Sequence, residues 1–225
     1  MEFQLKFKVN DNLYLRDPEN TEMGKSIVKN TIELIFEIGF ENFTFRKLAQ
    51  RINCTEATVY RYFSSKHKLL TYILNWYWSY LELISKFRLA EIKVPKEKIV
   101  KMLSIITHND ESEETIQDYD LEKLHSIVIA ESSKSYLVKE VDEINKDLVF
   151  NPLKSLCNFF GEVILEAKPN FPYPKSLAST LLETAHDQQF FSEHLPRLTD
   201  NFETGKPHKK YVLEYLSYTA FNLIK

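Results

Sequence analysis

Residues 53–63, NCTEATVYRYF, place groups that could bind a ligand along one short segment. Thr55 is a residue type that caps the start of a helix, and two Tyr and an Arg follow it closely. A helix buried inside a protein needs neither the Tyr hydroxyls nor the guanidinium. We therefore expect a short helix over residues 56–62 that lies against something outside the chain.

The charge around this segment differs from that of the rest of the chain. The 225 residues carry a formal net charge of −3 at pH 7. Residues 1–72 hold eleven Lys and Arg against nine Asp and Glu, whereas residues 73–225 hold 18 against 23. Within residues 44–68, six basic residues face a single acid, Glu56. A local basic patch on an acidic protein indicates a polyanionic partner that binds at one place.

Two helices before this segment complete a helix-turn-helix pattern. Apolar residues recur at three- and four-residue spacing from Met23, and Gly39 follows where a left-handed residue ends a helix. Thr44 is placed to cap a second helix over residues 45–51. In the short turn that follows, Asn53 tolerates the left-handed conformation that the tight corner needs.

A helix-turn-helix binds DNA by placing its last helix in the major groove, where side chains at the start of that helix reach base edges. Ala57 and the methyl group of Thr58 suit a thymine methyl group, and Arg61 suits guanine. Glu56 has two alternative interpretations. It accepts a hydrogen bond from cytosine N4, or it only stabilises the start of its own helix.

The stretch FTFRKLAQRINCTEATVYRYFSSKHKLL resembles the DNA-binding segment of the TetR-like (TetR/AcrR) bacterial transcriptional regulators. That pattern runs Thr-x-Arg-x-[Leu/Ile]-Ala, a turn, Ser/Thr-x-x-Thr-[Leu/Val]-Tyr-x-[His/Tyr]-Phe, and then a Lys. The resemblance covers about residues 24–71, with Asn53 in place of the usual Gly and Glu56 in place of an uncharged residue. The residues that we predict to contact DNA are Thr44, Arg46, Thr55, Glu56, Ala57, Thr58, Tyr60, Arg61, Tyr62 and Lys66. Among them, Thr44, Tyr62 and Lys66 are placed for phosphates.

The resemblance implies a two-domain, all-helical homodimer whose larger domain encloses a ligand pocket. The last two helices would pair across the two-fold axis in a four-helix bundle, and helices predicted over residues 176–195 and 208–224 suit that role. We accordingly expect an all-α fold with three parts. These are an arm or small hairpin at residues 1–22, a helix-turn-helix domain at 23–71 and a ligand-binding and dimerisation domain at 72–225.

The remaining sequence is predicted to be helical between breaks. Further helices are expected from Ser65 to about residue 87 and over residues 96–107 and 121–132, with another beginning near Lys134. The acidic residues 108–120 read as a solvated loop. Two alternatives stay open. Pro152 either starts a helix or kinks a long one, and the alternating residues 3–9 are either a strand of a hairpin or an arm that orders only on contact.

Other classes of function lack their motifs in this chain. No Gly-x-Ser-x-Gly, Walker loop, HExxH or Rossmann fingerprint occurs, so we do not expect an enzyme or a cofactor. Cys54 and Cys157 lie far apart, and the helical His125, His186 and His194 are of a kind that is more often surface or interface than metal ligand, so we predict no metal. No apolar run reaches the roughly 18 residues of a membrane span, and we expect a cytoplasmic protein without membrane contact.

We interpret the chain as a ligand-responsive repressor that binds double-stranded DNA at a palindromic operator as a homodimer. The alternative is a dimeric architectural or partner-regulated DNA-binding protein without a small-molecule inducer. The expected effector is small and apolar or aromatic, because aromatic residues gather at residues 72–80 and at Phe159 and Phe160. Core packing alone is the more common explanation of such aromatic residues.

Overall fold

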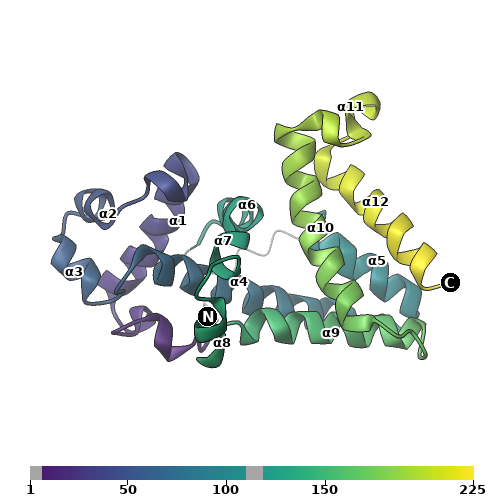
Figure 1. The fold of residues 1–225 in the computed structure, drawn as a ribbon, viewed down its shortest axis with the longest axis horizontal. Helices are drawn as coiled ribbons and strands as arrows, with labels where there is room; N and C mark the ends of the chain where they lie inside the picture. Colours follow the sequence, from purple (N-terminus) through teal and green to yellow (C-terminus); the bar gives the residue numbers. More distant parts are fainter. Residues whose placement is uncertain (1–6, 110–118) are drawn as a thin grey trace. The chain divides into compact units, whose positions relative to one another are not determined.

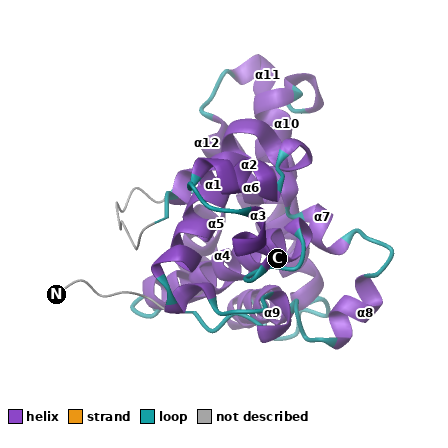
Figure 2. Cartoon of the chain, turned by 90° about the vertical axis from the view of Figure 1, so that its left-hand side faces the viewer, coloured by secondary structure: helices purple, strands orange, loops and turns teal. Residues whose placement is uncertain are grey.

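The computed structural model describes residues 7–109 and 119–225, which form helices joined by turns (Figure 1). No strand occurs in these two ranges (Figure 2), and the all-α prediction is confirmed. The chain divides into two compact units, Met1–Tyr77 with Glu114–Pro152 and Trp78–Glu113 with Leu153–Lys225. These units are defined by packing, and their boundaries differ from the predicted functional boundaries after residues 22 and 71. The functional division stays a prediction.

The predicted helices occur in the predicted order, with small differences at their ends, but two short helices stand where one was expected to begin near Lys134, and residues 201–204 form a helix that was not predicted. They are α1 (Glu22–Asn42), α2 (Phe45–Arg51), α3 (Glu56–Tyr60), α4 (Lys66–Leu89), α5 (Pro95–Ile106), α6 (Leu121–Glu131), α7 (Ser133–Tyr136), α8 (Val141–Lys146), α9 (Asn151–Ala167), α10 (Pro174–His194), α11 (Asn201–Thr204) and α12 (His208–Leu223). Three short 3-10 helices are η1 (Asp11–Leu13), η2 (Pro18–Asn20) and η3 (Pro196–Leu198). Most of the acidic loop predicted at residues 108–120 lies outside the described residues.

Local chemistry explains where several helices begin. Asp120 caps α6 by accepting a hydrogen bond from the backbone N–H of Lys123. Proline stands at the first position of α5 and of α10, where its missing N–H costs nothing. Helix α9 begins at Asn151, so Pro152 starts a helix, which resolves the alternative left open by the sequence.

The start and end of α1 depend on two glycines and a threonine. The Thr21 hydroxyl caps the helix by accepting from the backbone N–H of Gly24. A side chain at Gly24 would meet the carbonyl oxygen of Pro18 at 2.3 Å, so only glycine lets η2 approach here. Gly39 has φ 74° and ends the regular part of α1, as predicted from its place in the sequence.

The segment before α1 packs against α4. The Phe7 ring meets Trp76 edge-on at 5.3 Å between centroids, and Tyr14 meets Tyr72 at 6.1 Å. The hairpin interpretation needed a second strand at residues 13–15, but Leu13 ends η1, which Asn10 caps, and neither Tyr14 nor Leu15 belongs to a strand. Most of the strand predicted at residues 3–9 lies outside the described residues.

In the first unit, α6 packs along α1 and holds its end. Lys123 of α6 pairs with Glu33, and Lys134 of α7 pairs with Glu41 at 2.8 Å. The buried Glu131 carboxylate accepts from the backbone N–H of Phe40 at 3.3 Å and lies 2.8 Å from the Lys134 ammonium. Tyr72, Trp76 and Tyr77 are fully buried, which agrees with the interpretation of these aromatic residues as core.

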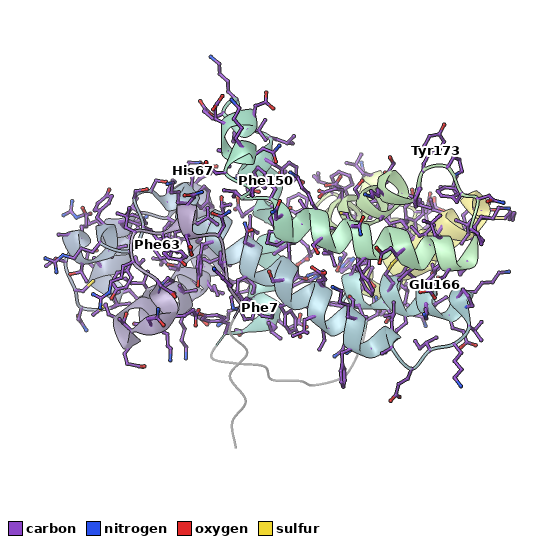
Figure 3. The ribbon with its side chains drawn as sticks, turned by 90° about the horizontal axis from the view of Figure 1, so that it is seen from below. Phe7, Phe63, His67, Phe150, Glu166 and Tyr173 are labelled. Atoms are coloured by element: carbon purple, nitrogen blue, oxygen red, sulfur yellow. The ribbon has the colours of Figure 1, made fainter. Side chains whose placement is uncertain are left out.

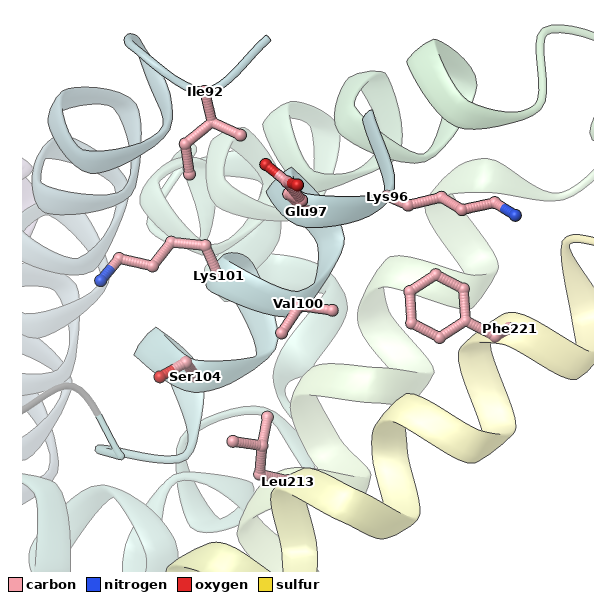
Figure 4. Close-up of a pocket in the computed structure, with 8 residues that line it drawn as sticks. All are labelled: Ile92, Lys96, Glu97, Val100, Lys101, Ser104, Leu213 and Phe221. Atoms are coloured by element: carbon pink, nitrogen blue, oxygen red, sulfur yellow. The ribbon is translucent and has the colours of Figure 1, made fainter. Parts of the chain in front are cut away.

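In the second unit, α12 packs against α10 and α5. Lys98 of α5 forms an ion pair at 2.5 Å with Glu166 of α9, and Figure 3 labels Glu166. An open groove of about 480 Å³ lies between α5 and α12, lined by Val100, Leu213 and Phe221 among others (Figure 4). His186 of α10 is buried, and this burial lowers the pKa of its imidazole to about 4.

No described helix is both long enough and apolar enough to span a membrane. Likewise, the described ranges bring no three His, Cys, Asp or Glu side chains together in a way that could hold a metal ion. The three histidines weighed as metal ligands are divided between the units. His125 is buried in the first unit, 2.8 Å from the Tyr77 hydroxyl, whereas the buried His186 and the exposed His194 belong to the second.

Candidate nucleic-acid interface

Helices α2 and α3 form the predicted helix-turn-helix, each with its predicted cap. The Thr44 hydroxyl accepts from the backbone N–H of Lys47, and the Thr55 hydroxyl accepts from that of Thr58, both at 3.2 Å. Between the helices, Asn53 has φ 51°, the left-handed conformation predicted for this corner. The backbone N–H of Cys54 donates to the carbonyl of Ala49 at 2.9 Å and closes the turn.

Apolar contacts fix α3 against α2. The side chains that pack there are Phe45, Leu48, Ala49 and Val59, all buried. Val59 has no exposed surface. One face of α3 is therefore fixed against the protein, and the opposite face is the one that can point outward. The Tyr60 ring packs edge-on against Phe45 at 4.9 Å between centroids but remains 50% exposed.

The start and outer face of α3 are open to solvent. Thr55, Glu56, Ala57 and Arg61 are exposed, and Thr58 is half-buried. The hydroxyls of Thr55 and Thr58 lie 3.0 Å apart, so each supports the other at the helix start. The structure therefore brings the predicted base-reading residues together on one exposed surface.

The basic residues around α3 fall into two groups. Arg51 is bound by both oxygens of Glu37, at 2.6 and 2.8 Å, and this hydrogen bonding lowers the pKa of the Glu37 carboxyl. The Lys47 ammonium donates to the carbonyl of Asn42. Arg46 and Arg61 are exposed and have no ion-pair partner within the described residues. These two guanidinium groups are the cations most available to an anion.

Tyr62 lies where the sequence did not place it. Its side chain is only 3% exposed, and its hydroxyl lies 2.8 Å from that of Thr21. The Leu15 N–H donates to the Tyr62 carbonyl at 2.7 Å, and the Arg16 guanidinium lies over the ring. Helix α3 ends at Tyr60, two residues earlier than predicted. A phosphate contact by the Tyr62 hydroxyl is thus a wrong prediction for this arrangement, because the hydroxyl faces the start of α1.

Lys66 is also held inside the protein. Its ammonium donates to the carbonyls of Phe40, Glu41 and Phe43 at 3.0, 3.3 and 3.4 Å. It also lies 4.6 Å from the centroid of the Phe40 ring. Lys66 therefore neutralises the carbonyl end of α1 in addition to any role toward an external anion.

Sequence reasoning missed three residues that position this surface. Thr21 caps α1 and meets Tyr62, Arg16 covers the Tyr62 ring, and Glu37 holds Arg51. A Thr followed directly by Glu at the start of an apolar helical pattern is a cap signal, so Thr21 could have been found. The contacts of Arg16 and Glu37 join positions distant in sequence and leave no local signal.

The chain matches the family model described as bacterial regulatory proteins, tetR family, over residues 27–73. No curated protein matches it. A structure of AibR in complex with isovaleryl coenzyme A and operator DNA is 17% identical, covering 87% of this chain and 96% of that one with a TM-score of 0.58. The fatty acid degradation regulator FadR from Bacillus halodurans is 14% identical, covering 87% and 93% with a TM-score of 0.59.

The fold is not confined to proteins described as regulators. The superantigen PfiT is 14% identical, with 89% of this chain and 96% of that chain covered and a TM-score of 0.58. At such low identity these likenesses show the fold alone, and function must be argued from the exposed surface of α3.

Proposed function

We propose that this chain is a member of the tetR family of bacterial regulatory proteins and a transcriptional repressor that binds operator DNA as a homodimer. The observation that carries the proposal is the exposed start of α3. A short helix is fixed on one face by Val59 while Glu56, Ala57 and Arg61 face solvent. That arrangement fits a helix whose first residues enter the major groove.

Base readout would come from the start of α3 and phosphate contact from the residues around it. Arg61 and Arg46 offer exposed guanidinium groups with no ion-pair partner in residues 7–109 and 119–225, and Tyr60 offers a half-exposed ring that bears a hydroxyl. The Thr44 and Thr55 hydroxyls already accept from their own helices, so toward a phosphate each acts as a donor. Lys66 supports this surface mainly by holding the end of α1.

Dimerisation is proposed through α10 and α12. On α12, Tyr211, Tyr215 and Tyr218 follow one another at helical spacing, and Tyr218 is 73% exposed. Tyr215 is also exposed and Tyr211 is half-buried, and an aromatic stripe that is partly exposed in this way is typical of a helix that packs against a partner. Two copies would then present their α3 helices to half-sites about one DNA turn apart.

Regulation by a small molecule is the third part of the proposal. AibR was solved with isovaleryl coenzyme A and with operator DNA, and FadR is described as a regulator of fatty acid degradation. A ligand that binds better to a conformation unsuited to the operator would release the DNA. We propose no catalytic role for the chain and place it in the cytoplasm with its operator.

The test begins with genomic fragments selected by the purified protein, from which an operator is defined. Arg61→Ala should weaken operator binding roughly tenfold or more, because a bidentate contact to guanine contributes about 1–3 kcal/mol. Lys93→Ala, an exposed lysine in the loop between α4 and α5, serves as the control. Wild-type affinity should also fall steeply with salt.

Two results would contradict the proposal. One is an operator affinity that Arg61→Ala leaves equal to that of Lys93→Ala. The other is the absence of any selected fragment, with binding that does not depend on salt. Sedimentation that shows only monomer at micromolar concentration would contradict the proposed dimer. It would also contradict the palindromic operator, which requires two copies.

A further inference from the structure

A cavity of about 350 Å³ lies inside the first unit, at the start of α4. Its walls come from η1, from the first turns of α4 and from the segment α7 to α8. His67, labelled in Figure 3, lines it from α4. The volume is in the range of about 300–1,000 Å³ that small-molecule pockets occupy. Nothing in the function proposed above uses this cavity.

The walls of the cavity are mostly apolar. Leu13, Leu70 and Val149 are buried and form its deeper surface. Val138 and Ile144, both half-buried, complete the apolar lining from α7 to α8. Binding of an apolar group against this surface is favourable, because it removes apolar area from water.

Two hydrogen-bond donors, Lys68 and Ser65, line the cavity near the start of α4. The Lys68 ammonium donates to the carbonyl of Asn12 at 2.9 Å and has no carboxylate partner within the described residues. The Ser65 hydroxyl accepts from the backbone N–H of Lys68, which leaves its own proton to donate. A carboxylate, which only accepts hydrogen bonds, complements this pair.

Five other polar residues of the lining are already engaged or stand apart, and the His67 ring meets Phe40 edge-on at 5.1 Å between centroids. The hydroxyls of Thr71 and Ser135 donate to backbone carbonyls. Lys134 is paired with both Glu41 and Glu131. The acids Glu140 and Asp147 are exposed and flank α8 at opposite ends, so they do not form a joint site for a cation.

We propose that this cavity binds a small amphipathic carboxylate, with its apolar body against Leu13, Leu70 and Val149 and its carboxylate at Lys68 and Ser65. A regulatory consequence rests on the proposed function. The first turn of α4 carries both Lys68 and Lys66, and Lys66 holds the end of α1. A ligand bound at Lys68 therefore changes the support of the helix-turn-helix directly and alters operator affinity.

Binding is tested without DNA by calorimetric titration of the full-length protein with octanoate, octylamine and octanol, which share one chain and differ in head group. Octanoate should bind most tightly. Lys68→Met should weaken octanoate at least tenfold and leave octanol unchanged. Lys93→Met, which removes an exposed lysine outside the cavity, should behave as wild type.

The site itself is tested by filling it. Val138→Trp places a large side chain in the cavity and should abolish octanoate binding, with Ile144→Trp as the substitute if the first variant does not fold. In methyl-labelled wild-type protein, octanoate should shift the resonances of Leu13, Val138, Ile144 and Val149. The absence of those shifts, or octanoate binding that survives the filled cavity, overturns the site.

Tighter binding of octylamine than of octanoate overturns the ligand class. The regulatory consequence is measured separately, as operator affinity with and without saturating octanoate. If octanoate binds at Lys68 but operator affinity is unchanged, the ligand site stands and its regulatory role fails. If no operator is found while octanoate still binds, the proposed function fails and the ligand site stands.

Discussion

The first and last residues of the segment 55–66 share one sequence motif but stand in opposite environments. Thr55, Glu56 and Ala57 are exposed, and their contacts are local to the start of α3. Tyr62 is buried against Thr21, and Lys66 donates to three carbonyls at the end of α1. The same run of residues thus supplies a surface for a partner and an anchor for that surface.

The difference teaches how loss of binding should be interpreted in this protein. A substitution at the exposed end changes what the surface meets and leaves its support intact. A substitution at the anchored end changes where the surface lies, and it acts first on stability. DNA binding alone cannot separate these cases, so each variant needs an unfolding measurement beside it.

Tyr62→Ala should have the largest effect on stability. Truncation of a buried aromatic side chain costs about 3–5 kcal/mol of unfolding free energy. Tyr62→Phe, the matched control, keeps the ring and loses only the hydrogen bond to Thr21, which is worth about 1 kcal/mol. Chemical denaturation measures both. If Tyr62→Ala were as stable as the wild type but lost DNA binding, Tyr62 would contact DNA directly, like the exposed residues of α3, and would not anchor the helix.

Lowering the pH should destabilise the second unit through His186. Burial holds the pKa of this imidazole at about 4 in the folded protein, against 6.5 for the ordinary group. The unfolded chain therefore binds the proton first, so stability is full above pH 6.5 and falls by about 3 kcal/mol as the pH drops toward 4. The exposed end of α3 takes no part in this loss.

Denaturation midpoints measured between pH 7 and pH 4 test this dependence. In His186→Gln the slope should be much reduced. His194→Gln, at an exposed position of the same helix, should keep the wild-type slope. An unchanged slope in His186→Gln would show that other groups carry the acid sensitivity.

Lys66→Met should have an intermediate effect. The ammonium donates to three backbone carbonyls at the end of α1, and loss of these charge-assisted contacts should cost about 1–2 kcal/mol. Operator affinity should fall with it, because the end of α1 supports α2. Lys93→Met is the matched control. A variant with wild-type stability but weakened binding would instead assign Lys66 to direct phosphate contact.

The sequence predicted those parts of the fold whose causes are local. The caps Thr44, Thr55 and Asp120 and the left-handed Asn53 need only their neighbours in the chain, and all four are confirmed. The prediction failed where the cause is distant. Tyr62 was placed on the exposed surface because its partner Thr21 lies 41 residues away.

The same distinction between local and distant causes explains which features of the candidate site could be predicted from the sequence. The sequence predicted that Glu56, Ala57 and Arg61 are exposed, and they are, because the buried Val59 holds the other face of α3 against α2. Their contact with DNA stays a prediction. Which cations remain available could not be predicted, since the pairing of Arg51 with Glu37 joins two helices. Short segments such as α11 escaped prediction because four residues show no periodicity.

Glu56→Gln should have the smallest effect on stability and still decide between two interpretations. The side chain is exposed in the first turn of α3, so the denaturation midpoint should stay close to that of the wild type. We expect the ratio of operator to scrambled-DNA affinity to fall roughly tenfold, because the carboxylate accepts from a cytosine and excludes other bases. Competition binding at fixed salt measures the ratio. If both affinities rise equally, removal of a negative charge near phosphates is sufficient to explain the result, and Glu56 only stabilises its helix.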